Sequence, residues 1–138
     1  MSFDCLCLNV YIPKKSKSSD DDILLPAMLF VHGGSNAAGT STYLDGTALA
    51  GIGDVIVVSA NYRLDVMGFM SIPEANIKGN YGLWDQLNAI KWLHTNCLEL
   101  GCDPNLITLF GHSAGSGDIM LLSQSKLVQP YIKRIILQ

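Results

Sequence analysis

The sequence predicts an α/β fold with a mostly parallel central sheet flanked by helices, and two observations carry this prediction. The first is a set of short, continuous apolar runs, which suit strands buried on both faces. They are AMLFVH (Ala27–His32), VIVVSA (Val55–Ala60), ITLF (Ile107–Phe110) and RIIL (Arg134–Leu137). The second is that helical patterns separate the later runs, and such alternation is typical of βαβ crossovers.

The first predicted strand is LCLNVYI (Leu6–Ile12), which has near-alternating polarity and ends at Pro13. The segment Lys14–Asp22 (KKSKSSDDD) follows and contains no core-forming residue. Its positive and negative charges largely cancel, which favours a solvated loop over an interaction tail. We therefore expect the tip of a hairpin here.

Two helices are predicted from periodicity. Over Gly82–Asn96 an apolar stripe recurs at three- and four-residue spacing (Leu83, Leu87, Ile90, Leu93 and Cys97), whereas Asp85, Gln86 and Lys91 fall off it. A second helix follows Ser113, although Gly115 and Gly117 weaken its first turn. The chain has no repeat and no low-complexity linker, so a single folded unit is expected.

The composition is unusual for a free-standing domain of 138 residues. Hydrophobic residues make up 49% and charged residues only 15%, against about 25% charged in typical soluble domains. A small domain has much surface to cover, so we favour a piece of a larger protein. The net charge of −3 argues against a nucleic-acid partner.

No targeting or membrane segment is predicted. No apolar run approaches the roughly 18 residues of a transmembrane segment. The first ten residues, MSFDCLCLNV, lack a basic region followed by an apolar stretch and do not resemble a signal peptide. Either the chain is intracellular or its natural N-terminus is missing.

The four cysteines do not predict a metal site. Cys5 and Cys7 are expected on one face of the first strand, while Cys97 and Cys102 lie far along the chain. The C-x-x-C spacing of structural zinc sites does not occur. Buried thiols and disulfides both remain open, with no pairing assigned.

The segment ITLFGHSAGSGD contains a G-x-S-x-G pattern centred on Ser113. Serine is a poor nucleophile unless a base activates it and the oxyanion formed on attack is stabilised. In a nucleophile elbow the serine occupies a tight strand-to-helix turn, and Gly111 and Gly115 let the strand and the helix approach closely. The N–H of Ala114, at the helix N-terminus, then faces the oxyanion. Alone the pattern is weak, because chance supplies it on the order of one time in twenty, and the alternative is a small residue in a tight turn.

A second motif raises the odds that Ser113 is functional. His32-Gly33-Gly34 comes directly after the predicted strand over Ala27–His32. An HGG-type loop after an early strand is the other half of the oxyanion arrangement in elbow hydrolases. The alternative is a plain glycine turn. Together the two motifs predict a site for nucleophilic attack on a carbonyl.

These two motifs and the blocks around them resemble the type-B carboxylesterase/cholinesterase family of α/β-hydrolases, with five blocks in all, the last of which contains the G-x-S-x-G motif. Besides the HGG motif, the blocks are DCLCLNVYIP (4–13), NYRLDVMGFMS (61–71), GNYGLWDQLNAIKWLHTN (79–96) and GCDPNLITLFGHSAG (101–115). They occur in the family's order and cover most of the chain. The resemblance implies one partial α/β-hydrolase domain over residues 1–138, truncated at both ends.

The resemblance also implies a site and a reaction. Ser113 matches the nucleophile, and the amides of Gly34, Ser35 and Ala114 match the oxyanion hole. Gly33 matches a flexible neighbour, and supporting positions are Gly111, His112 and Gly115. The implied substrates are small carboxylic esters, which form an acyl-enzyme that water releases, and neither a metal nor an organic cofactor is implied.

Several positions depart from the family pattern. His112 stands where the family usually has Glu, so an imidazole replaces an anion and weaker selection for cationic esters is expected. Asn36 replaces an aromatic residue, which predicts a more polar or more open acyl pocket. Ser35 replaces a glycine or alanine, and Cys102 a glycine. The family pairs the cysteine matching Cys5 with an upstream one that this sequence lacks.

The residues that would activate Ser113 are not evident in the chain. The α/β-hydrolase order is Ser, then Asp or Glu, then His, yet the 25 residues after Ser113 hold no His and no Glu. Asp118 is the only carboxylate there, within the predicted helix. We expect His112 to project away from the Ser113 hydroxyl, His32 to orient the loop backbone and His94 to lie near solvent. The triad acid and histidine are therefore expected outside these residues, and the chain alone to be inactive.

Two alternatives to an esterase remain. One is an adhesion or recognition protein that uses the cholinesterase-like fold as a scaffold, although members of that branch typically lose the serine. The other is an unstable partial product with uncovered strand edges. The sequence has no N-x-S/T site, and only the family resemblance favours secretion or the lumen of the endoplasmic reticulum.

Overall fold

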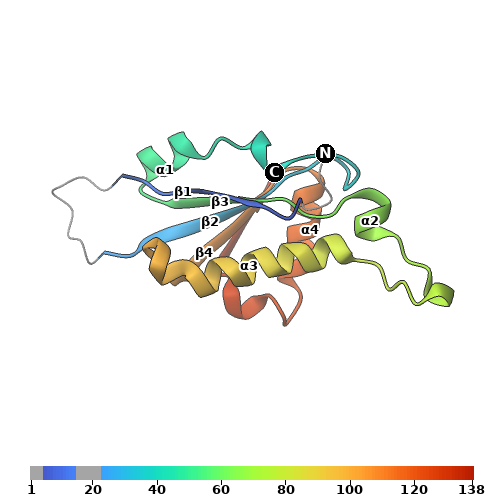
Figure 1. Cartoon of the computed structure of the whole chain (residues 1–138). Coiled ribbons are helices and arrows are strands. Elements are labelled where there is room, and N and C mark those ends of the chain that lie inside the picture. The colour runs from blue at the N-terminus through green and yellow to red at the C-terminus, as the bar shows by residue number, and fades with distance from the viewer. Residues whose placement is uncertain (1–4, 15–22) are drawn as a thin grey trace.

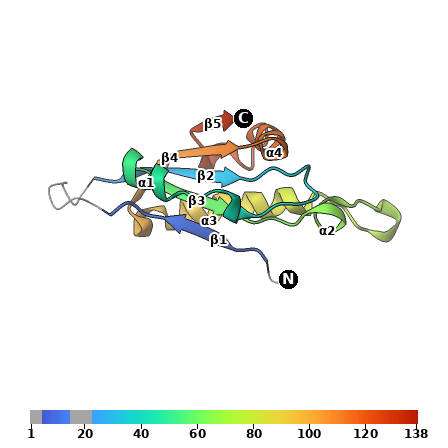
Figure 2. The ribbon, with the colours of Figure 1, turned by 90° about the horizontal axis from the view of Figure 1, so that it is seen from above.

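The computed structural model describes residues 5–14 and 23–138, which form a five-stranded mixed sheet flanked by helices (Figure 1). Viewed from above, the strands follow the order β1-β3-β2-β4-β5 (Figure 2). Their bounds are β1 Leu8–Tyr11, β2 Leu25–Val31, β3 Ile56–Ala60, β4 Cys102–Gly111 and β5 Arg134–Leu137. The strand at Arg134–Leu137 begins and ends where the apolar run predicts.

The sheet is mostly parallel, as predicted. β2 pairs in parallel with β3 and with β4, and β4 pairs in parallel with β5. β1 alone runs antiparallel, against β3. The predicted hairpin is therefore wrong: β3 lies between β1 and β2, so the segment after Lys14 joins two strands that do not pair. Residues 15–22 of that segment lie outside the described residues.

Helices cover both faces of the sheet, which explains the continuous apolar runs. α3 (Tyr81–Leu100) and α4 (Ala114–Ser123) pack on one face, and α1 (Thr47–Gly53) packs on the other (Figure 1). All five residues of β3 are buried as a result. α2 (Asp65–Phe69) follows β3, and short 3-10 helices cover Ser41–Tyr43, Pro73–Ala75 and Gln129–Tyr131.

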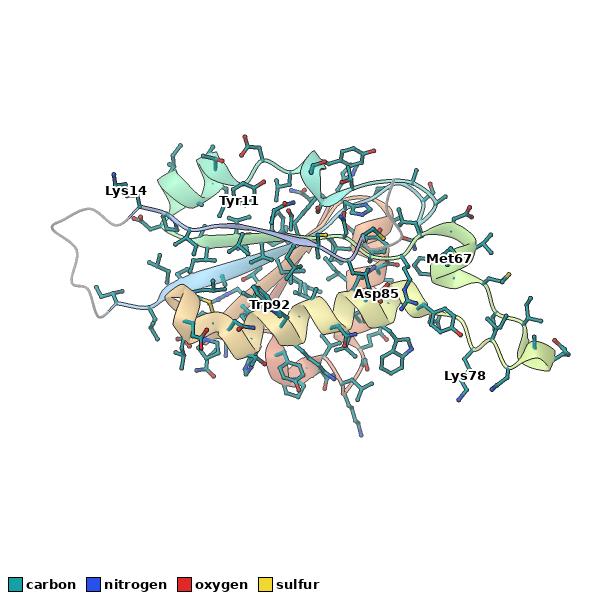
Figure 3. All side chains as sticks on the ribbon, in the orientation of Figure 1. Tyr11, Lys14, Met67, Lys78, Asp85 and Trp92 are labelled. Atoms are coloured by element: carbon teal, nitrogen blue, oxygen red, sulfur yellow. A yellow bond between two sulfur atoms is a disulfide. The ribbon has the colours of Figure 1, made fainter. Side chains whose placement is uncertain are left out.

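The apolar stripe of α3 packs on the sheet as predicted, and its members Leu87, Ile90, Leu93 and Cys97 are buried. Asp85 and Gln86, which the pattern places off the stripe, are buried as well. Burial of these polar side chains is tolerated because both are hydrogen-bonded. Asp85 lies on the sheet-facing side of α3 (Figure 3) and accepts two 2.7 Å hydrogen bonds from the guanidinium of Arg63.

A disulfide joins Cys97, near the end of α3, to Cys102, the first residue of β4. Cys5 and Cys7 are exposed free thiols that precede β1, so the prediction that they share a strand face is wrong. The strand begins later because only Leu8 onward pairs with β3. Among the helices of the described residues, none combines the length and apolar character needed to cross a bilayer.

Candidate active site

Ser113 lies on a sharp turn between β4, which ends at Gly111, and α4, which begins at Ala114. Its backbone adopts φ 54° and ψ −121°, a strained conformation of the kind that clusters at functional sites. The side chain is exposed. Within residues 5–14 and 23–138, its hydroxyl has no hydrogen-bond partner. The strand–turn–helix context predicted for the G-x-S-x-G motif is therefore present.

Two glycines let the turn close. A Cβ on Gly115 would overlap the carbonyl oxygen of Val31, and one on Gly111 would lie 2.8 Å from the Gly115 carbonyl carbon. Any larger residue would push α4 away from the end of β2. The predicted close approach of strand and helix at these glycines is confirmed.

The end of β5 anchors the same turn. The Ser113 N–H donates to the backbone oxygen of Gln138 at 2.7 Å, and the Gln138 N–H donates back to Gly111 at 3.1 Å. Ser116 donates its hydroxyl to the Gly111 oxygen at 2.6 Å. Because these bonds engage the backbone on both sides of Ser113, they hold the strained residue in place.

The HGG motif forms a loop directly after β2, here called the oxyanion loop (His32–Gly39) after the role that the sequence predicts for it. Gly34 has φ 115°, Ser35 56° and Asn36 57°, so three successive residues have positive φ. The N–H groups of Ala37 and Ala38 both donate to the Gly34 oxygen at 3.0 Å and close the turn. The amides of Gly34, Ser35 and Ala114 donate to no acceptor in the described part of the chain. Their N–H groups are thus available to a ligand.

Gly33 brings the oxyanion loop against the turn that holds Ser113. A Cβ on Gly33 would lie 2.5 Å from the His112 oxygen and 3.0 Å from Ser113 Cβ. Its φ is not positive, so glycine is required here by space and not by backbone freedom. The two motifs, about 80 residues apart, thus meet in one place, as elbow hydrolases require.

His32 is buried beneath the loop. Its Nδ1 lies 2.8 Å from the Gly33 oxygen, and its ring stacks on Tyr62 with centroids 4.5 Å apart. Tyr62 donates its hydroxyl to the His32 backbone oxygen at 2.7 Å. These contacts fit a histidine that orients loop backbone, the role expected for it.

A buried carboxylate joins the loop to α4. Asn36 Nδ2 donates to Asp118 Oδ1 at 3.0 Å, and Gln86 Nε2 donates to Asp118 Oδ2 at 2.6 Å. Asp118 is 3% exposed. Burial raises its pKa, and the hydrogen bonds from Gln86 and Asn36 oppose that rise. The pKa of Tyr62 is raised as well, by burial first and then by the charge of Asp118.

The other two histidines, His112 and His94, do not contact the Ser113 hydroxyl as a general base would. His112 is exposed, and its Nδ1 is 3.3 Å from the position of a Cβ on Gly33. The His94 ring meets the edge of Tyr131, with centroids 5.0 Å apart, and is half-buried. Within residues 5–14 and 23–138, no histidine donates to or accepts from the Ser113 hydroxyl.

A shallow groove of about 310 Å³ borders the oxyanion loop, with Ser35 and Asn36 on one side and Val66, Phe69 and Met70 on the other. The described residues contain no cluster of three or more His, Cys, Asp or Glu side chains suited to a metal ion. The groups that this site offers to a ligand include the Ser113 hydroxyl and the backbone amides of Gly34, Ser35 and Ala114.

Comparison with known proteins decides the family. The Carboxylesterase family model matches residues 1–138. The chain belongs to the carboxylesterase family. Among solved structures, a thermophilic PNB esterase matches 97% of the chain with a TM-score of 0.87 and 36% identity, and the match covers 28% of that protein. The type-B carboxylesterase/cholinesterase resemblance and the α/β-hydrolase fold are thereby confirmed.

Relatives of this carboxylesterase-family chain carry different names. Neuroligin-2 of Mus musculus is 42% identical over 99% of the chain and 18% of its own length. Bile salt-activated lipase of Bos taurus is 43% identical over 98% and 24%. Carboxylesterase 3B of Mus musculus is 41% identical over the whole chain and 24% of its own length. The chain spans about a fifth to a quarter of the curated relatives it matches.

Three residues of the site were not predicted as part of it: Tyr62, Gln86 and Asp118. Gln86 and Asp118 are buried polar residues on helices, and helical periodicity assigns polar residues to the solvent face. Tyr62 lies between β3 and α2, where no periodic pattern marks it. One feature of the sequence could have indicated the burial of Asp118: it is an acidic residue in the apolar segment GDIMLL, which follows the motif closely. A carboxylate in such surroundings is seldom buried without partners.

Proposed function

We propose that this chain carries the nucleophile and the oxyanion hole of a serine carboxylic-ester hydrolase. The observation that carries the proposal is the meeting of the two motifs at Gly33 and Ser113. The Ser113 side chain is exposed, and the amides of Gly34, Ser35 and Ala114 donate to no acceptor within the described residues. Family membership supports the reaction class. The substrate class is small carboxylic esters.

In the proposed reaction the Ser113 Oγ attacks the ester carbonyl carbon, and a histidine base takes the hydroxyl proton. The carbonyl oxygen becomes an oxyanion that accepts hydrogen bonds from the amides of Gly34, Ser35 and Ala114. Collapse of this intermediate expels the alcohol, which receives the proton, and leaves an acyl group on Ser113. Water then attacks the acyl carbon, releases the carboxylic acid and restores the hydroxyl.

The triad acid and histidine are proposed to come from parts of the parent protein outside these 138 residues. Two observations support this. The chain spans only 18–25% of the length of its curated relatives. Its histidines are engaged elsewhere or lack a contact with Ser113, and Asp118 is bound by two amides. The isolated chain should therefore turn over esters poorly.

Ester hydrolysis by the full-length parent tests the proposal. p-Nitrophenyl acetate and butyrate serve as substrates, with Ser113→Ala as the variant. We expect hydrolysis that depends on Ser113, with kcat reduced by a factor on the order of 10⁴ or more in the variant. Equal rates for the variant and the parent would reject Ser113 as the nucleophile.

The second candidate is a non-catalytic recognition scaffold, which the neuroligins among the relatives favour. The retained Ser113 in a strained turn opposes it, because such strain needs support that a scaffold has no reason to maintain. The parent sequence after Gln138 discriminates between the two. An Asp or Glu and a His in the family's later blocks support the hydrolase, and their loss supports the scaffold.

A secretory route is proposed for the parent. The Cys97–Cys102 disulfide supports it, because disulfides persist mainly in oxidising compartments. Free thiols at Cys97 and Cys102 in protein isolated from its native source under alkylation would contradict this location.

A further inference from the structure

The side chain and carbonyl of Asn36 connect the oxyanion loop to α4, to α2 and to the segment between β3 and α2. Its Nδ2 donates to Asp118 on α4 at 3.0 Å, and its Oδ1 accepts from the Tyr62 hydroxyl at 3.1 Å. Its backbone oxygen accepts from the N–H of Asp65, the first residue of α2, at 2.6 Å. Of these contacts, only the bond to Asp118 reaches the helix that begins immediately after Ser113.

Asp118 lies one and a half turns along α4 from that serine, and both of its carboxylate oxygens are engaged. One accepts from Asn36 and the other from Gln86 on α3, at 3.0 and 2.6 Å. An aspartate that oriented a catalytic histidine would instead accept from an imidazole N–H. Its partners identify Asp118 as a brace between the loop and two helices.

We propose that Asp118 is a positioning residue, whose carboxylate holds the oxyanion loop, through Asn36, at a fixed place relative to the helix that begins behind Ser113. This inference rests on the proposed function. It extends the proposed function, because Asp118 is neither the proposed nucleophile nor one of the proposed oxyanion donors. The amides of Ser35 and Ala114 belong to different segments, so they form one hole only if loop and helix keep their spacing.

The positioning role requires that residue 118 offer Asn36 a hydrogen-bond acceptor, but it does not require a negative charge. Two variants therefore give different expected results. Asp118→Asn keeps one oxygen for Asn36. Its new amide N–H finds an acceptor if the Gln86 amide turns, because Gln86 Oε1 is buried without a partner within residues 5–14 and 23–138. Asp118→Leu keeps the branched shape but is larger and has no acceptor, so it leaves Asn36 Nδ2 unpaired.

The test is amide hydrogen exchange by NMR on the 138-residue chain. The reporting amides are Ala37 and Ala38, which donate to Gly34, and Asp65, which donates to Asn36. Leu122→Ala is the matched control, because Leu122 is 7% exposed on the same helix and packs into the core cluster. Asn36→Gly removes the same bond from the loop side and retains a backbone compatible with positive φ.

We expect the three amides to exchange at least about tenfold faster in Asp118→Leu and Asn36→Gly than in Leu122→Ala. In Asp118→Asn they should stay within about threefold of the unmodified chain. The proposal is overturned if the three amides exchange no faster in Asp118→Leu than in Leu122→Ala. It is also overturned if they exchange as fast in Asp118→Asn as in Asp118→Leu. If Asp118→Leu does not fold, Asn36→Gly decides by the same criterion.

A second readout tests whether the brace serves Ser113. Slow phosphonylation by a fluorophosphonate, followed by intact mass over hours, should be about tenfold slower in Asp118→Leu than in Leu122→Ala. If the loop amides exchange faster in Asp118→Leu while the rate of phosphonylation stays unchanged, the positioning role is overturned. Absence of labelling at Ser113 in the unmodified chain and in the parent would instead overturn the proposed function, and exchange would still decide whether Asp118 holds the loop.

Discussion

Gly33 and Ser113 lie so close that a Cβ on the glycine would be 3.0 Å from the serine Cβ. The His112 oxygen would be closer still, at 2.5 Å. Neither neighbour is the end of a flexible side chain, so neither can move without shifting the turn. The contact therefore couples the position of the oxyanion loop to the position of the nucleophile.

Replacement of Gly33 by Ala should separate the two motifs. The new methyl group must displace the loop or the turn, which misplaces the oxyanion donors. Loss of one such donor typically costs a factor on the order of 10²–10³ in kcat, and we expect kcat/KM of the full-length parent to fall by about 10². Ester hydrolysis measures this.

Gly51→Ala is the control for Gly33→Ala, because Gly51 is exposed on α1 and a Cβ there would meet no atom of the described residues within 4 Å beyond its chain neighbours and its own helix backbone. It should leave hydrolysis unchanged. Equal activity in the Gly33→Ala and Gly51→Ala variants would show that the contact does not set the geometry of the site.

Gly115→Ala and Gly117→Ala form a matched pair on α4. A Cβ on Gly115 would overlap the Val31 oxygen and lie 2.7 Å from the His32 oxygen. One on Gly117 would meet nothing within 4 Å in the described part of the chain, apart from its chain neighbours and its own helix backbone. Gly115→Ala should destabilise the fold by roughly 1–3 kcal/mol through overpacking. Gly117→Ala should stabilise it by roughly 0.5–1 kcal/mol through helix propensity. Urea unfolding measures both, and two variants of equal stability would refute the close packing of α4 on β2.

Asp118 should make stability depend on pH in the direction opposite to an aspartate whose pKa is lowered by folding. Burial raises its pKa in the fold, so from pH 3.8 upward the folded state holds this proton more tightly than the unfolded state. Its contribution to stability is therefore present at low pH and declines as pH rises through the raised pKa. His32 and Tyr62 are the titratable groups beside it.

Asp118→Asn removes the titrating carboxyl, so this group no longer binds a different number of protons in the folded and unfolded states. The stability of the variant relative to the unmodified chain should rise with pH above 3.8, by at most about 1.4 kcal/mol per pH unit. Urea unfolding of both proteins between pH 4 and 7 checks the slope. A difference that stays flat, or that falls with pH, would show that the pKa of Asp118 is not raised.

The Cys97–Cys102 disulfide should stabilise the junction of α3 and β4. It closes a short loop with a sequence separation of five, and loop-closure entropy then predicts a contribution of about 2 kcal/mol. The double variant Cys97→Ala/Cys102→Ala should melt at a lower temperature and lose its sensitivity to reductant. Cys7→Ser is the control, since Cys7 is an exposed free thiol. If reductant left the melting temperature of the unmodified chain unchanged, the bond would not contribute.

The strands and the two long helices were predictable because burial on both faces leaves a continuous apolar run and burial on one face leaves a stripe. Ile56–Ala60 and Tyr81–Leu100 are examples. The pairing of β1 was not, because local patterning does not specify which strand lies beside which. A charged segment between two strands suggests a hairpin, and here β3 intervenes instead.

The elbow and the HGG loop were predictable because tight turns demand glycine at fixed spacing. The brace under them was not. Asp118 lies on α4, Gln86 on α3 and Tyr62 in the segment between β3 and α2, and only the fold brings them together. The local sequence pattern predicts whether such a residue is exposed or buried, but it does not predict its hydrogen-bond partner.

The most direct test of the central claim is the rate and the position of fluorophosphonate labelling, measured by peptide mass spectrometry. In the full-length parent, rapid labelling confined to Ser113 is predicted. In the 138-residue chain, labelling at Ser113 should be slower by a factor on the order of 10³ or more, because the activating base is absent. Labelling of the parent at a different residue, or none, would contradict the assignment of Ser113, and equally rapid labelling of both proteins would contradict the proposed origin of the base.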